Sequence, residues 1–121
     1  MKKSFMVVVA AAFVAILAGC SSIPDNPNLS GKWNYKYGKQ QKTGSMDLVQ
    51  SAQQLSGTSN DAEGQFIVSG TVKGPVVALN GKCPKSKKTY TINARMKDEN
   101  TFKGTYTTTT GNFGNIIGTR Q

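Results

Sequence analysis

Histidine is absent from this 121-residue chain, and acidic side chains are scarce, with six Asp and Glu against 15 Lys and Arg. Without histidine the chain lacks the usual general base, the Cys-His nucleophile pair and the commonest metal ligand. A carboxylate pair for glycoside hydrolysis would have to combine Asp47 with a loop carboxylate such as Asp61 or Glu63. Solvated surface charge is the simpler interpretation of these residues. We therefore expect no enzyme and no metal or cofactor site.

Long apolar runs are also missing, except for one near the N-terminus. Lys2 and Lys3 precede the apolar residues 5–18, and Gly19 and Cys20 follow them. A transmembrane helix needs about 20 apolar residues, so this run is too short to span a bilayer. A charged start, a short apolar stretch and a small residue at its end are typical of a secretory signal peptide. The pattern predicts that residues 1–19 are removed.

The four residues "LAGC", Leu17 to Cys20, resemble the lipobox of bacterial lipoprotein precursors. The resemblance implies that the Cys20 thiol is acylated, that cleavage occurs just before it, and that the lipid anchors the protein to a membrane. Ser21 follows the cysteine where inner-membrane lipoproteins tend to carry Asp, which implies the outer membrane, facing the periplasm. The alternative is an ordinary signal peptide in which Cys20 is incidental.

Behind the cysteine, residues 21–30, "SSIPDNPNLS", carry two prolines and no apolar period, which predicts a flexible tether that includes Cys20 and ends at Ser30. Loss of Lys2 and Lys3 would leave 13 basic against 6 acidic residues, a formal charge of +7. Such a charge attracts phospholipid, lipopolysaccharide and other anionic envelope components without choosing among them. Alternatively, the excess lysine only keeps a small domain soluble. Nucleic acid is not an expected partner.

From residue 31 onward the apolar period is two, which is typical of half-buried strands. In "GKWNYKY" the aromatic residues alternate with polar ones, and "TGSMDLVQ", "QFIVSGTV", "TYTINARM" and "TFKGTYTT" alternate in the same way. Adding "QLSGTS", "PVVALN" and "NIIGTR" gives eight strands, separated by short turn-rich segments. The sequence thus predicts an all-β domain over residues 31–121, folded as an eight-stranded antiparallel up-and-down barrel.

Four of these strands contain a Gly-Thr pair that follows an apolar residue and one other residue, at positions 57, 70, 104 and 118. Glycine weakens a strand interior, so its repeated use indicates a shared geometric demand, such as the sharp coiling that closes a small sheet into a barrel. The alternative is that glycine interrupts threonine-rich strands and so protects them against aggregation.

A strand that opens with Gly31-Lys32-Trp33 and a last strand that carries Arg120 resemble the calycins, the group of lipocalins, avidins and similar small barrels. The resemblance implies that Trp33 plugs one end of the barrel and that Arg120 packs across its ring. "LSGKWNYKYG" is most similar to an avidin first strand. Avidins line their biotin site with several tryptophans, and this chain has one, so biotin binding is not carried over.

The segment "GKCPKSKKTY", residues 81–90, surrounds Cys83 with Lys82, Lys85, Lys87 and Lys88. Nearby positive charge favours the thiolate, so Cys83 is a candidate reactive thiol or disulfide partner; the alternative is an inert thiol. The four lysines are a candidate anion-binding loop, and the alternative is ordinary solvated charge.

Together these features predict a lipid-anchored, non-enzymatic envelope adaptor or binding module whose basic loop faces an anionic component or another envelope protein. Two alternatives stay open. One is a carrier that holds a small apolar ligand in the barrel, and the other is an inhibitor of an envelope hydrolase.

Overall fold

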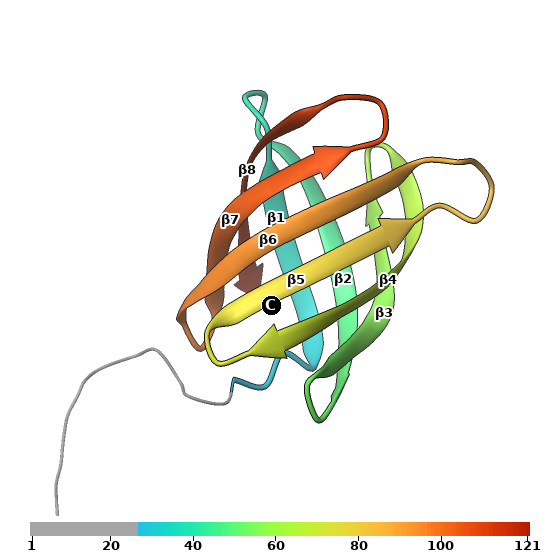
Figure 1. The fold of residues 1–121 in the computed structure, drawn as a ribbon. Helices are drawn as coiled ribbons and strands as arrows, with labels where there is room; N and C mark the ends of the chain where they lie inside the picture. The colour runs from blue at the N-terminus through green and yellow to red at the C-terminus, as the bar shows by residue number, and fades with distance from the viewer. Residues whose placement is uncertain (1–26) are drawn as a thin grey trace, which may run out of the picture.

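Eight antiparallel strands close into a single barrel in the computed structural model, which describes residues 27–121 (Figure 1). Each strand pairs with its neighbours in sequence, and β1 pairs with β8 to complete the cylinder. The predicted eight-stranded antiparallel barrel is confirmed. The strands are β1 (Gly31–Tyr37), β2 (Lys42–Ser51), β3 (Gln54–Asp61), β4 (Gly64–Lys73), β5 (Val76–Lys82), β6 (Thr89–Asp98), β7 (Thr101–Thr108) and β8 (Phe113–Arg120).

Alternation along each strand decides which side chains fill the barrel. In β1, Trp33, Tyr35 and Tyr37 are buried, while Lys32 and Lys36 on the opposite face are exposed. The same period of two buries one face of β6 from Tyr90 to Met96. Eighteen hydrophobic residues form one continuous core inside the cylinder, as expected for an eight-stranded barrel that is filled by its own side chains.

Close approach between strands accounts for most of the repeated Gly-Thr glycines. A Cβ atom at Gly57, Gly70 or Gly104 would collide with a backbone carbonyl oxygen of the neighbouring strand. Only a residue without a side chain allows the two backbones to come that near. The demand for close packing therefore explains these three positions better than protection against aggregation does.

Four inward aromatic rings lie directly over a glycine on the neighbouring strand. At each of these glycines the ring occupies the space that a side chain would take or lies in contact with it. Covering a strand glycine with a cross-strand aromatic ring shields the exposed backbone and helps to fix register. The pairs are Tyr35 with Gly44, Tyr90 with Gly81, Phe102 with Gly118, and Tyr106 with Gly114.

The two ends of the barrel differ in what reaches them. The described chain begins beside the start of β1, at the end where the β2–β3, β4–β5 and β6–β7 turns lie. The β1–β2, β3–β4, β5–β6 and β7–β8 turns lie at the opposite end (Figure 1). We call the first the plugged end and the second the open end. No helix within residues 27–121 is long and apolar enough to cross a membrane.

The last four residues of the predicted tether belong to the barrel. Pro27 and Leu29 are buried, and Leu29 is fully covered at the plugged end. Gln50 fixes this segment, because its side chain accepts the Leu29 N–H at 2.8 Å and donates to the Pro27 carbonyl at 3.1 Å. The structure thus differs from the expectation of a tether that runs to Ser30. Cys20 and residues 21–26 lie outside the described residues, as does the predicted signal peptide.

Candidate functional site

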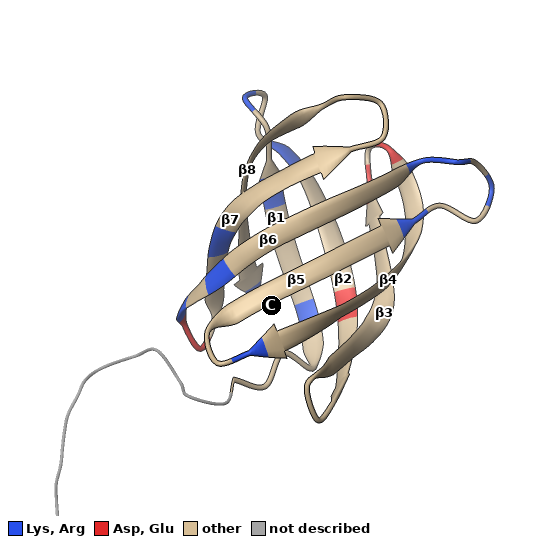
Figure 2. Ribbon diagram, in the orientation of Figure 1, with Lys and Arg blue, Asp and Glu red and all other residues tan. Residues whose placement is uncertain are grey.

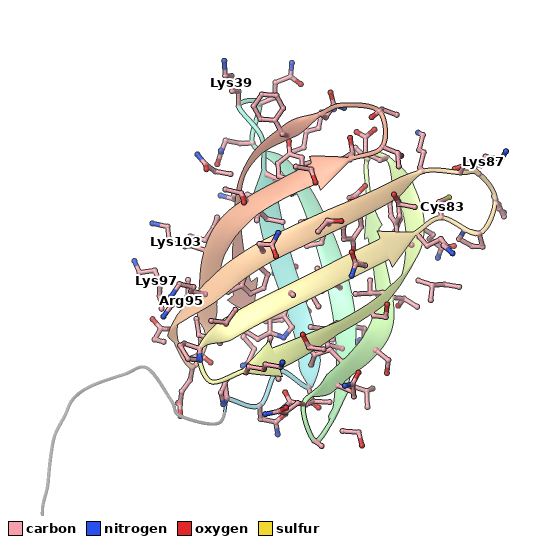
Figure 3. All side chains as sticks on the ribbon, viewed as in Figure 1. Lys39, Cys83, Lys87, Arg95, Lys97 and Lys103 are labelled. Carbon is pink, nitrogen blue, oxygen red and sulfur yellow. The ribbon has the colours of Figure 1, made fainter. Side chains whose placement is uncertain are left out.

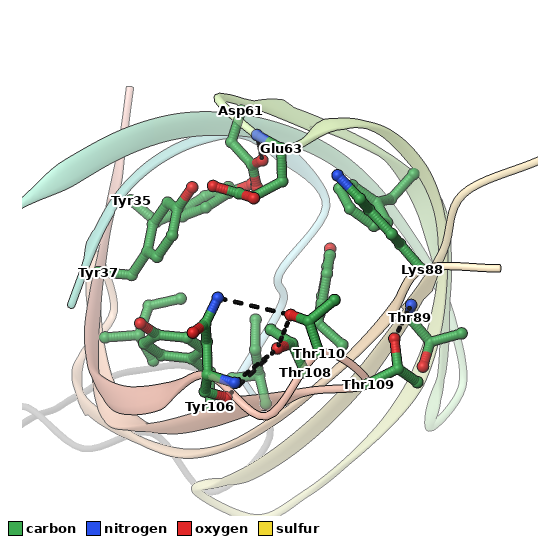
Figure 4. Close-up of a pocket in the computed structure, with 15 residues that line it drawn as sticks. Tyr35, Tyr37, Asp61, Glu63, Lys88, Thr89, Tyr106, Thr108, Thr109 and Thr110 are labelled. Carbon is green, nitrogen blue, oxygen red and sulfur yellow. Dashed lines mark hydrogen bonds between the residues drawn. The ribbon is translucent and has the colours of Figure 1, made fainter. Parts of the chain in front are cut away.

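A pocket of about 50 Å³ lies at the open end of the barrel (Figure 4). A space of this size admits a small group and not a drug-sized ligand, which needs about 300 Å³ or more. Tyrosine rings, threonine side chains and two carboxylates dominate its lining. The lining residues are Tyr35, Tyr37, Asp61, Glu63, Phe66, Lys88, Thr89, Tyr90, Ile92, Tyr106, Thr108, Thr109, Thr110, Asn112 and Ile116.

Strand alternation and one tight turn bring the polar groups of the pocket together. Tyr35 and Tyr37 are the last two inward residues of β1, and Tyr106 lies near the end of β7. Asp61 is the last residue of β3, and Glu63 lies in the two-residue turn before β4. In Figure 4 the two carboxylates lie on one side of the pocket and the threonines of the β7–β8 region on another.

Asp61 is held in place by two hydrogen bonds. The Tyr35 hydroxyl donates to its Oδ2 at 2.5 Å, and the Glu63 backbone N–H donates to its Oδ1 at 2.7 Å. The Glu63 carboxylate lies 3.2 Å from the Lys42 ammonium in an ion pair, which is the one ion pair among residues 27–121. Asp61 therefore has no cationic partner within that range, and its negative charge at the pocket is uncompensated.

Tyr37 carries a buried hydroxyl without a hydrogen-bond partner among the described residues. Its side chain is 8% exposed, and its ring packs edge-on against Tyr106 and at a tilt against Tyr35, with centroid separations of 5.4 and 5.8 Å. A buried polar atom left unpaired costs about 1 to 3 kcal/mol. The pocket thus holds an unsatisfied hydroxyl together with Asp61, a carboxylate that has no cationic partner among residues 27–121.

Three of the phenols that line the pocket, those of Tyr35, Tyr37 and Tyr90, stay neutral around pH 7. Burial, and then the interaction with Asp61, raises the pKa of Tyr35 and of Tyr37 well above the usual tyrosine value. Burial also raises the pKa of Tyr90 to about 12, against the opposing effect of its hydrogen bond with Ser59, whose hydroxyl oxygen lies 2.7 Å from that of Tyr90. The negative charge of the pocket consequently resides on the two carboxylates, while the phenols act as neutral hydrogen-bonding groups.

At the plugged end, Trp33 is fully buried, and the Arg120 guanidinium lies 4.5 Å from the centre of its ring. The indole N–H donates to the Leu29 carbonyl at 2.9 Å. Arg120 donates to the carbonyl oxygens of Ser30, Asn28 and Glu99 at 2.9, 2.7 and 2.9 Å. These contacts tie β1, β8, the β6–β7 turn and the N-terminal segment together, so the end is closed by packing and by hydrogen bonds.

The predicted anion-binding loop joins β5 to β6 and extends from the open end (Figures 2 and 3). Its four lysines, Lys82, Lys85, Lys87 and Lys88, are all exposed, and none forms an ion pair with a carboxylate of the described residues. Lys88 also lies at the edge of the pocket. The loop therefore presents uncompensated positive charge next to a pocket of negative charge.

Cys83, the single cysteine within residues 27–121, is free and partly buried at the start of this loop, where it packs against the edge of the core. Hydrogen bonding with the Ser86 side chain, then with the Lys85 backbone, and more weakly the charge of Lys88 lower the pKa of its thiol. Whether it reacts stays a prediction. Metal ligands are not brought together, since no three His, Cys, Asp or Glu side chains cluster in the part of the chain that the structure describes.

Sequence reasoning missed the pocket because each of its residues has an ordinary local explanation. The tyrosines alternate like barrel filling, and Asp61 and Glu63 flank a turn like solvated charge. Their meeting depends on the pairing of β1 with β2 and of β2 with β3, which places Gly44 opposite both Tyr35 and Asp61. That small residue leaves room for the phenol to reach the carboxylate. The only local signal is a carboxylate at the end of a strand in an otherwise basic chain.

Comparison with known proteins shows similarity of fold alone. No family model matches the chain, and no curated protein matches it. Among solved structures, a redesigned β-barrel, b11L5F_LGL, superposes with a TM-score of 0.67 at 17% identity, covering 84% of this chain and 99% of its own.

Two further small barrels are similar. The redesigned barrel mFAP1, bound to DFHBI, gives a TM-score of 0.57 at 16% identity, covering 77% of this chain and 94% of its own. A fluorescence-activating β-barrel designed de novo gives a TM-score of 0.60 at 10% identity, covering 78% of this chain and 94% of its own. At these identities the chain is an eight-stranded antiparallel barrel similar in fold to small designed barrels, some of which bind a fluorophore.

Proposed function

We propose that this protein is a non-enzymatic binding module of the bacterial envelope, anchored to the outer membrane by a lipid on Cys20, which presents its basic β5–β6 loop to an anionic surface. The observation that carries the proposal is the opposition of the two ends. Pro27, the first described residue after Cys20, lies at the plugged end, and the loop extends from the open end. An anchor at Cys20 would leave the loop pointing away from its own membrane.

Electrostatics supports an anionic partner for this loop. The exposed lysines of residues 82–88 have no acidic partner among residues 27–121. Like charges that crowd together without compensation repel one another, and a polyanion relieves that repulsion. Anionic phospholipid headgroups are a suitable surface, because they attract each basic residue by about 1 kcal/mol at short range.

The small pocket favours this proposal over a carrier of apolar ligands. A cavity of about 50 Å³ is far smaller than the roughly 300 Å³ or more that a drug-sized ligand needs, so it lacks the volume for a lipid chain. An inhibitor of an envelope hydrolase is weakened by charge where the enzyme is basic, since a formal charge of +7 on the mature chain would repel it.

The anchor is tested by replacing Cys20 with Ser. The wild type should incorporate a radioactive fatty acid and sediment with membranes, and Cys20→Ser should lose the label and remain soluble or unprocessed. Undiminished labelling of Cys20→Ser would contradict the lipid anchor.

The loop is tested by docking in trans. Full-length protein reconstituted in neutral phosphatidylcholine vesicles should recruit separate vesicles that contain phosphatidylglycerol. Lys85, Lys87 and Lys88 changed together to Gln should abolish most of this recruitment, because only the open end reaches the second membrane. Salt should also weaken it, since the Debye length falls from about 10 Å at 0.1 M to 3 Å at 1 M.

A matched control removes the same charge elsewhere. Lys97 and Lys103 are exposed near the plugged end (Figure 3), as is Lys73 at the end of β4, and Gln at these three positions should leave recruitment nearly unchanged. Equal losses in the two triple variants would mean that net charge acts without a specific surface. No loss in the loop variant would overturn the proposal.

A further inference from the structure

Several features of the open-end pocket point to one kind of ligand. The Asp61 carboxylate is fixed by two hydrogen bonds and has no cationic partner among residues 27–121. The Tyr37 hydroxyl, on a side chain that is 8% exposed, is unpaired within the same range and lies in the same lining. A partner for Asp61 must carry positive charge or donate hydrogen bonds, and the Tyr37 hydroxyl oxygen can accept a hydrogen bond from the same group.

We propose that this pocket binds the primary ammonium group of a small amine. An ammonium group offers three N–H donors and one positive charge, so it can donate to Asp61 and to the Tyr37 hydroxyl oxygen together. Charge-assisted hydrogen bonds of this kind are about twice as strong as neutral ones. The inference does not rest on the proposed function, because it concerns other residues and the opposite sign of ligand charge.

Aromatic rings complete the environment of the ammonium. Tyr35, Tyr37 and Tyr106 contact one another in sequence, and Phe66 packs against Tyr90 with ring centroids 4.9 Å apart. Ring faces attract cations by about 0.5 to 2 kcal/mol, and the attraction is greatest where water is displaced. Because the phenols of Tyr35, Tyr37 and Tyr90 are neutral, their rings and hydroxyls add to the charge of Asp61 and do not compete with it.

The size and polar groups of the pocket favour one type of ammonium group. The space of about 50 Å³ fits an –NH₃⁺ group, which is about the size of a water molecule. A quaternary ammonium, with three methyl groups around the nitrogen, is bulkier at the charged centre and has no N–H to donate to Asp61 or Tyr37. The pocket is therefore suited to primary amines, with the rest of the molecule extending out through the open end.

The neighbouring cations set the strength of binding. Lys42 is occupied by its ion pair with Glu63. Lys88 lines the pocket edge, across from Tyr35 and Tyr37 in Figure 4, and forms no ion pair with either carboxylate. Its charge opposes that of the ligand, so removal of this charge should strengthen amine binding.

The proposal is tested by titrating the full-length protein, in a nonionic detergent, with n-propylammonium chloride at constant ionic strength. Backbone amide NMR signals of Glu63, Thr108 and Thr110 should shift and saturate. The isosteric n-propanol should give no such shifts, and tetramethylammonium should bind at least about tenfold more weakly, the loss expected when a charged hydrogen bond is removed.

Variants separate the pocket from general surface charge. Asp61→Asn should raise the Kd for n-propylammonium about tenfold or more. The matched control Asp47→Asn removes an exposed carboxylate on the barrel wall and should change the Kd less than about twofold. Tyr37→Phe should raise the Kd several-fold, and Lys88→Gln should lower it.

Dispersion of the amide spectrum reports whether each variant is folded, and Glu63→Gln replaces Asp61→Asn if the latter unfolds.

Equal shifts with propanol, or a Kd unaffected by both Asp61→Asn and Glu63→Gln, would overturn the inference. Shifts spread over all exposed carboxylates would likewise reduce it to nonspecific charge attraction. These outcomes leave the loop proposal untouched, because Lys88→Gln should strengthen amine binding while the triple Gln variant weakens vesicle recruitment.

Discussion

Both ends of this barrel bury aromatic residues, but they differ in whether the buried polar atoms have hydrogen-bond partners. At the plugged end, the polar atoms of Trp33 and Arg120 reach partners on two other parts of the chain, the N-terminal segment and the β6–β7 turn. At the open end, Tyr37 is buried to a similar degree, yet its hydroxyl has no partner among residues 27–121. Aromatic burial alone therefore does not distinguish a structural end from a binding end. The distinguishing property is whether the buried polar atoms have hydrogen-bond partners.

The largest effect is expected from breaking the plugged end. Trp33→Ala should lower the free energy of unfolding by about 3 to 5 kcal/mol, the range for large aromatic truncations in a packed core. Urea denaturation followed by circular dichroism measures the loss. Phe113→Ala is the matched control at the open end, because Phe113 is 78% exposed and should matter by less than about 0.5 kcal/mol. In the wild type, Trp33 fluorescence should be blue-shifted and resist iodide; emission at the wavelength of free tryptophan would contradict its burial.

Alkaline pH should lower the stability of the barrel through ionisation of Tyr90, a buried residue at the open end. The pKa of Tyr90 is raised to about 12 by burial, above the value near 10 expected in the unfolded chain. A raised folded-state pKa means that its contribution is complete below about pH 10 and is lost as pH rises from about 10 through 12. The loss should be roughly 2 to 3 kcal/mol. Phenolate absorbance should appear together with unfolding, and Tyr90→Phe should show a smaller loss over this window. An unchanged pH dependence in Tyr90→Phe would exclude this cause.

Replacing Arg120 should lower stability by less than replacing Trp33, because the buried indole remains in place. Arg120→Gln loses the guanidinium over Trp33 and leaves three carbonyl oxygens with fewer donors, for an expected loss of about 1.5 to 3 kcal/mol. Arg120→Lys should recover only part of this, since an ammonium lacks the planar fork of donors. Lys103→Gln, an equal charge change on the exposed wall, should have an effect below about 0.5 kcal/mol. Equal losses at the two sites would remove the structural distinction of Arg120.

The smallest expected effect is on stability at the open end, where removing a tyrosine hydroxyl should have opposite signs at Tyr37 and at Tyr35. Tyr37→Phe removes an unpaired buried hydroxyl and should leave stability unchanged or raise it by about 1 kcal/mol. Tyr35→Phe removes the donor to Asp61 and should lower stability by about 1 to 2 kcal/mol. Thermal unfolding of both variants at pH 7 measures the pair. A loss in Tyr37→Phe comparable to that in Tyr35→Phe would mean that the Tyr37 hydroxyl has a stabilising partner.

Local pattern was enough to predict the barrel, and the reason is physical. The alternation in "GKWNYKY" and "TYTINARM" survives in the structure because one face of each strand meets the core and the other meets water. Turn-rich segments between the strands allowed their order to be predicted as well. Strand ends were less accurate: the last strand was expected to begin near Asn115, and it begins at Phe113.

The pocket and the N-terminal closure could not be predicted in the same way. The contact between Tyr35 and Asp61 spans 26 residues of sequence and depends on the register of three strands. In the sequence Leu29 resembles part of a linker, since the polar residues Asn28 and Ser30 flank it. Its side chain becomes buried only because the folded barrel provides an apolar interior at the plugged end. The first feature depends on the register of neighbouring strands and the second on the cylinder that the sheet forms, and no short window of sequence contains either.

The aromatic rings that cover glycines on neighbouring strands have a consequence for how such a chain can change over time. Each pair is one spatial unit shared by two distant positions, so enlarging the glycine forces the ring out, and losing the ring leaves bare backbone. Substitutions at these positions should be tolerated in combination and rejected singly, while the outward residues between them drift freely. Sequences that have diverged on this barrel could then share little identity yet retain the paired positions, a signal that is visible to methods that score residues jointly and not to those that score them one at a time.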